Sequence, residues 1–148
     1  MPAARSIDEV IDSFNKTINA LLQTLIKKIP PNDITMQSNV ERLKKRLILA
    51  RKEMGSGFVI ENGAAIILKF KDKILERNEE FFTRLDIRAH FGDKLGKEAE
   101  SVCELIDYIK LIYNNSKRDE KDKLYGEVCN LLLDVVDFEL LRKIIIRS

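Results

Sequence analysis

Apolar residues recur at alternating intervals of four and three positions through most of the chain, which is the pattern of amphipathic α-helices. The first segment places Ile7, Ile11, Phe14, Ile18, Leu21 and Leu25 on one stripe, and Val10, Leu22 and Ile29 widen it. Ser6 and Glu9 form a capping box before this stripe, and Pro30-Pro31 ends it because proline cannot continue a helix. The pattern predicts a first helix that ends before Pro30.

A second helix is expected from about Asp33 to Met54. The apolar positions that repeat the spacing there are Met36, Val40, Leu43, Leu47, Ala50 and Met54. Asp33 is one candidate cap, but Ser38 with Glu41 is a competing capping box, so the start is open by several residues. The glycines at 55 and 57 are expected to stop the helix.

The middle of the chain is less regular. Apolar residues seven apart form two series, Ile67, Ile74 and Phe81, and Leu68, Leu75, Phe82 and Ala89. One long helix from about Gly63 to His90 would keep them on one stripe, whereas Asn78 could cap a separate helix from Glu79 to Phe91. We expect helix throughout with a break or kink near Asn78. The best strand candidate is Phe58–Glu61.

The C-terminal half again shows helical spacing. Leu95, Ala99, Val102, Ile106, Ile109 and Tyr113 predict one helix, and Leu124, Val128, Leu131 and Val135 begin another. The polar run Asn114–Lys123 predicts a turn between them, with Ser116 or Asp119 as cap. Phe138–Ile146 either extends the last helix or forms a short final one capped by Asp137. The whole pattern predicts an all-α protein, a single compact bundle of five to six helices over residues 1–148, packed at shallow angles.

Composition agrees with one soluble domain, because 148 residues that are 45% hydrophobic can form a core of their own. Cys103 and Cys129 lie in apolar runs and are expected to be buried, inert thiols. The N-terminal residues lack a hydrophobic signal region, and no apolar stretch approaches the ~20 residues that span a bilayer. We therefore expect an intracellular protein, cytoplasmic or nuclear, that is neither secreted nor in a membrane.

The sequence offers no catalytic constellation. His90 is the only histidine, and it is expected near a helix C-terminus, where the helix dipole favours it. The segment Gly92–Glu98 resembles a phosphate-binding loop, but it is one residue short between its glycines and lacks the magnesium-binding Ser or Thr. It is expected to be a helix–helix turn. We predict no enzyme activity, no cofactor, no metal and no small-molecule substrate.

The net charge of +2 conceals a gradient along the chain. Residues 1–54 hold ten basic and six acidic residues, whereas residues 97–148 hold nine and eleven. Six of the basic residues lie on the second helix, opposite its apolar stripe. Arg42, Lys45, Arg46 and Lys52 are expected to form one outward band, flanked by Lys44 and Arg51. This band is a candidate contact for a protein partner or a polyanion, and the alternative is an ordinary solvated helix face.

Several apolar residues fall outside the helical stripes: Leu49, Leu105, Leu111, Ile112 and Ile144–Ile146. Surplus apolar positions indicate either central burial or a partner interface, and a homodimer is one expected form. The leading hypothesis is a non-enzymatic helical module for protein–protein interaction or scaffolding. The alternative is an electrostatic nucleic-acid-binding protein that uses the basic helix 40–54.

In overall composition, a short helical chain containing many Lys, Ile and Asn without catalytic signature, the sequence resembles small accessory proteins of large DNA viruses of the marseillevirus-like group. The resemblance covers composition and transfers no residues. It implies a virion-associated or host-manipulating role, such as action on host nuclear or transcriptional components.

Overall fold

A computed structural model describes residues 5–86, 89 and 97–147 of the chain. This part of the chain contains seven α-helices and no strand. The helices are α1 (Ile7–Lys28), α2 (Ile34–Met54), α3 (Phe58–Lys69), α4 (Lys71–Leu75), α5 (Glu79–Arg84), α7 (Lys97–Asn114) and α8 (Arg118–Arg147). The predicted all-α class is confirmed, but the count of five to six is too low because the middle of the chain is divided into short helices.

The first two helices begin where the sequence predicts. The Glu9 amide donates to Ser6 Oγ, and the Ser6 amide donates to the Glu9 carboxylate, each at 3.1 Å, so the capping box is present. Asp33 caps α2 by accepting from the Met36 amide at 3.1 Å, which decides against the competing start at Ser38. Gly55 follows α2 with a φ of 101°, a backbone conformation that glycine adopts without strain.

The long helix expected from Gly63 to about His90 is wrong. The chain breaks at Phe70, whose ring lies in the core, and again at Arg77, which has a φ of 51°. The predicted break near Asn78 is confirmed: Asn78 caps α5 by accepting from the Phe81 amide at 3.0 Å. The strand candidate at residues 58–61 is helical. The alternative helix expected to reach Phe91 ends at Arg84, and Phe91 itself lies outside the described residues.

The last helix is longer than predicted. α8 begins at Arg118 and runs without interruption to Arg147, so the predicted turn at 114–123 covers only the short connection after Asn114. Phe138 and the residues after it extend this helix rather than starting a new one. A single helix of 30 residues spans about 45 Å.

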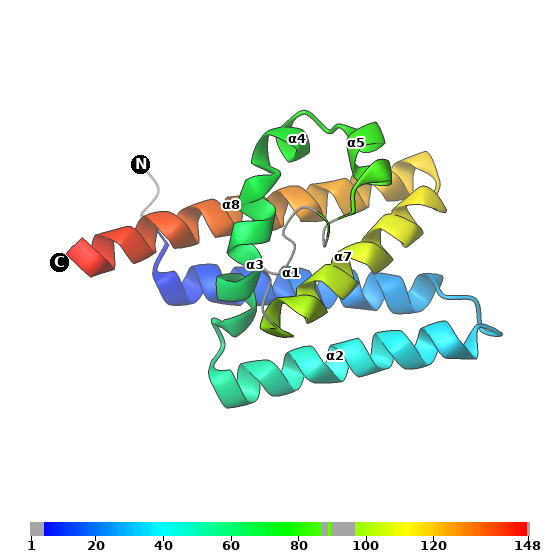
Figure 1. Cartoon of the computed structure of the whole chain (residues 1–148), viewed down its shortest axis with the longest axis horizontal. Coiled ribbons are helices and arrows are strands. Elements are labelled where there is room, and N and C mark those ends of the chain that lie inside the picture. Colours follow the sequence, from blue (N-terminus) through cyan, green and yellow to red (C-terminus); the bar gives the residue numbers. More distant parts are fainter. Residues whose placement is uncertain (1–4, 87–88, 90–96, 148) are drawn as a thin grey trace.

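Helix α1 is central to the arrangement. Figure 1 shows α1, α2 and α8 running along the long axis of the molecule, with α1 between the other two, while α3 crosses α1 and α8 and α7 lies obliquely. The packing therefore departs from a bundle of uniformly shallow angles. The most completely buried side chains of α1 are Val10, Phe14, Leu21, Leu22 and Leu25, and they join one continuous core with residues of α2, α3, α4, α7 and α8.

Candidate functional site

The side of α2 that faces away from the core carries an unusual mixture of side chains. Val40, Leu43 and Leu47 are buried on its inner side, where α2 contacts α1, α3 and α7. The opposite side exposes both basic and large apolar residues, and we call it the α2 outer face. It consists of Ile34, Arg42, Lys45, Ile48, Leu49 and Lys52.

The six basic residues singled out in the sequence differ in their surroundings. Arg42, Lys45, Arg46 and Lys52 are exposed, whereas Lys44 and Arg51 are half-buried. Arg46 donates to the Glu104 carboxylate on α7 at 2.8 Å. Arg42, Lys45 and Lys52 make no hydrogen bond or ion pair with the rest of the described chain, so their charges are free to meet a partner.

Arg51 is held against the molecule rather than presented to solvent. Its Nη2 donates to Asn19 Oδ1 of α1 at 3.2 Å, and its Nε donates to the Leu47 carbonyl at 3.4 Å. Burial lowers the pKa of Arg51 because desolvation penalises the charged guanidinium. Arg51 therefore ties α2 to α1 and is a poor contact for a partner.

The sequence pattern identified only part of the apolar component. Leu49 was expected to lie outside the apolar stripe, and it is 51% exposed. Ile34 and Ile48, which the pattern did not single out, are 73% and 47% exposed. Met54 was expected on the inner stripe, but it is 66% exposed.

The other surplus apolar residues have mixed outcomes. Leu111 and Ile144 are exposed, whereas Ile112 is buried in the core, which is the first of the two alternatives, central burial. The side chains of Leu105, Ile145 and Ile146 lie outside the described part of the structure. Leu133, Leu140 and Ile144 form a second exposed apolar row on α8, with intervals of seven and four residues.

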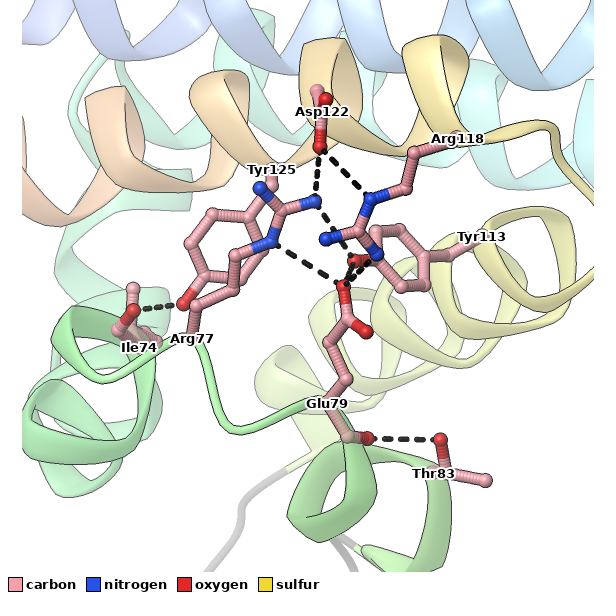
Figure 2. A network of polar contacts seen from close by, with 8 residues as sticks. All are labelled: Ile74, Arg77, Glu79, Thr83, Tyr113, Arg118, Asp122 and Tyr125. Carbon is pink, nitrogen blue, oxygen red and sulfur yellow. Dashed lines mark hydrogen bonds and ion pairs between the residues drawn. The ribbon is translucent and has the colours of Figure 1, made fainter.

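A polar network joins the start of α5 to α7 and α8 (Figure 2). Arg77 lies at its centre and contacts Glu79 at 3.3 Å and Asp122 at 2.5 Å. Arg118 reaches the same two carboxylates at 3.4 and 3.8 Å, and the Tyr113 hydroxyl donates to Glu79. Its partly exposed ion pairs connect the start of the short helix α5 to α8, and the Tyr113 hydrogen bond connects it to α7.

The electrostatics of this network follow from its contacts. The hydrogen bond from Tyr113 and the positive charges of Arg118 and Arg77 lower the pKa of Glu79. Hydrogen bonds with Tyr113 and Asp122 raise the pKa of Arg77. Burial raises the pKa of Tyr125 to about 12, and the Arg77 guanidinium lies 4.9 Å from its ring centre. The directions of the Glu79 and Arg77 pKa shifts favour the charged forms of these two groups, as expected of an ion-pair network.

The cysteines fit their predicted role in part. Cys103 is fully buried and Cys129 is half-buried. Burial raises the pKa of Cys129, which keeps it in the less reactive thiol form. His90 and the glycines at 92 and 96 lie outside the described residues.

Three further findings bear on function. Within the described residues no helix is both long and apolar enough to cross a membrane, and no three His, Cys, Asp or Glu side chains gather where they could hold a metal ion. Comparisons with protein-family models, with curated proteins and with solved structures give no match for this chain. The resemblance to viral accessory proteins therefore stays a prediction.

Proposed function

We propose that this protein is a helical interaction module that binds an acidic, amphipathic helix of a partner protein on the α2 outer face. One observation carries the proposal: Leu49 lies between Lys45 and Lys52 at intervals of four and three residues and is 51% exposed. That spacing places an apolar side chain within a basic row on the same side of one helix. A surface of this kind matches a partner helix that carries leucines flanked by carboxylates.

The apolar residues favour a protein partner over the alternative, a nucleic acid. Phosphate groups would contact Arg42, Lys45 and Lys52 but would gain nothing from Ile48 and Leu49. The helix also contains no aromatic residue on which bases could stack. A polyanion-binding surface would therefore leave its apolar positions in water, whereas a protein helix covers both kinds of side chain.

The experiment is a selection of displayed peptides on the immobilised chain. Peptides from a random helical library are selected on the wild type, on Leu49→Gln and on Lys45→Glu, with Gln23→Glu on the exposed side of α1 as the matched control. The proposal predicts enrichment of acidic peptides with apolar residues three and four apart on the wild type and on the control. Both α2 variants should lose that enrichment.

Two results would overturn the proposal. The first is no enrichment on the wild type, and the second is enrichment that persists on Leu49→Gln. A parallel titration with duplex DNA distinguishes the nucleic-acid-binding alternative from the proposed function. Electrostatic binding to DNA weakens steeply with salt and should not depend on Leu49. Salt-dependent DNA binding that Lys45→Glu removes and Leu49→Gln preserves would establish the nucleic-acid function in place of the proposed one.

A further inference from the structure

A partly open cavity of about 140 Å³ lies among helices other than α2, and its lining includes Glu79 and Tyr113 of the polar network. Six helices contribute side chains to its wall: α1, α3, α4, α5, α7 and α8. Residues that define it include Phe14 of α1, Ile66 of α3, Phe82 of α5, Ile109 of α7, and Val128 and Leu131 of α8. Well-packed cores leave few voids larger than a water molecule, so a space of this size calls for an explanation.

The break in the middle of the chain creates this space. α3, α4 and α5 turn around the cavity instead of forming one straight helix, and α5 buries none of its own residues. Phe70 and Phe82 stand edge to face with ring centres 6.4 Å apart, and both contribute to the wall. Rigid rings on short helices cannot collapse into the gap as flexible side chains would.

The polar side chains around the cavity direct their polar groups away from it. Each hydroxyl or ammonium group is bonded to another part of the wall, and Figure 2 shows three of these bonds. The Tyr113 hydroxyl donates to the Glu79 carboxylate, the Tyr125 hydroxyl to the Ile74 carbonyl, the Thr83 hydroxyl to the Glu79 carbonyl, and the Lys110 ammonium to the Leu85 carbonyl. These residues thus present carbon atoms to the space.

A cavity with such a wall is a poor site for water. A water held in such a space needs two to four polar partners, and the hydroxyl and ammonium groups of the lining are already engaged with other residues of the wall. Dry cavities of about 150 Å³ lined by Leu, Ile and Phe take up benzene or xenon. The apolar wall, its volume and the engaged hydroxyl and ammonium groups of the described lining therefore favour a small hydrocarbon group.

We infer that this cavity binds an apolar ligand without hydrogen-bonding groups, of the size of one aromatic ring or a short alkyl chain. The inference is independent of the α2 outer face. Ring and alkyl ligands share the chemistry that the wall recognises, and titrations with benzene and with hexane distinguish them. Phenol is the matched polar probe, because its hydroxyl would enter a wall that offers it no partner.

The test measures binding of benzene, hexane and phenol to the full chain by calorimetry. We expect one saturable site for benzene or hexane, with phenol bound at least about tenfold more weakly. Val128→Phe, which places a ring in the cavity, should abolish binding. Val136→Phe is the matched control, since Val136 is also half-buried on α8 but does not line the cavity.

Xenon provides a second measurement that needs no variant. Xenon dissolved with the wild-type protein should shift the methyl resonances of Ile66, Ile109 and Val128, and should leave those of Val10 unchanged. The inference is wrong if neither benzene nor hexane shows saturable binding, if phenol binds as tightly as benzene, or if Val128→Phe binds benzene like the wild type. Xenon shifts that spare the cavity residues would equally overturn it.

Discussion

Arg5 provides the sharpest test of how the two ends of the chain are joined. Its Nη1 lies 2.9 Å from Asp134 Oδ1, and its Nη2 lies 2.6 Å from Asp137 Oδ2. The Asp134 side chain is only 4% exposed and accepts one further hydrogen bond, from Ser13 Oγ at 2.9 Å. Of the charged residues that the structure describes, Asp134 alone is buried. Its carboxylate therefore depends on Arg5 for charge compensation.

The perturbation is Arg5→Met, which removes the charge and keeps the apolar stem. Removing one partner of a fully buried ion pair costs about 3–5 kcal/mol. Arg5 is 36% exposed, so water regains access to the site and Ser13 keeps its bond. We therefore expect a loss of about 2 kcal/mol in the free energy of unfolding. In a domain of this size that lowers the Tm by about 4–8 °C.

The assay is a double-mutant cycle measured by urea unfolding. In the Asp134→Asn background no buried charge depends on Arg5, so Arg5→Met should cost about 1 kcal/mol or less. Asp137→Asn is the matched control, because Asp137 is 46% exposed and its loss should cost under about 1 kcal/mol. An equal cost of Arg5→Met in both backgrounds would refute the reasoning, since Arg5 would then stabilise the fold without compensating Asp134.

Three other predictions concern the core, a half-buried carboxylate and a helix cap. Leu21 is fully buried, so Leu21→Ala should lower the free energy of unfolding by about 3 kcal/mol in urea titrations. Glu127 Oε2 is buried with no hydrogen-bond partner in the described chain, and burial raises the pKa of Glu127. A raised folded pKa means that the ionised carboxylate destabilises the fold as pH rises, so Glu127→Met should stabilise at pH 7, by less than about 1 kcal/mol because water partly screens this half-buried group. That gain should vanish in unfolding measurements below its ordinary pKa of 4.5. Asn78→Ala should cost about 1 kcal/mol and speed hydrogen exchange at the Phe81 amide, which loses its acceptor.

Local signals in the sequence predicted the ends of the first two helices correctly. The Ser6–Glu9 capping box and the Asp33 cap act within four residues, so the information that determines them is contained in short segments. The choice between Asp33 and Ser38 was open because both residue types cap helices. The structure decides in favour of Asp33, because the helix begins at Ile34, soon after the turn that contains the prolines at 30 and 31.

The middle of the chain was not predictable in the same way. Ile67, Ile74 and Phe81 keep a spacing of seven that one helix would also satisfy. The break at Phe70 arises because its ring packs into the core, which is a contact between distant segments. The positive φ of Arg77 could not be predicted from its residue type, since glycine or asparagine is the residue usually found in that conformation.

The candidate site was predictable in its charges and less so in its apolar residues. Position on a helix relative to the buried stripe gives exposure directly, which is why Arg42, Lys45 and Lys52 were assigned to the outside. Ile48 adjoins the buried Leu47, and only the arrangement of α1, α3 and α7 around α2 leaves it uncovered. The cavity depends on the volumes of side chains from six helices, and no pattern in the sequence predicts that.

The most direct test of the proposed function is photocrosslinking from the α2 outer face. A photoreactive phenylalanine derivative replaces Leu49, or Gln23 as the control, and the protein is irradiated in extracts of the cells in which it occurs. The proposal predicts a nuclease-resistant protein adduct from position 49 only, lost with Lys45→Glu, with the crosslinked peptide in an acidic, amphipathic helix. An adduct of twice the mass of the chain would instead identify a second copy as the occupant. A nuclease-sensitive adduct, or equal labelling from both positions, would contradict the proposal.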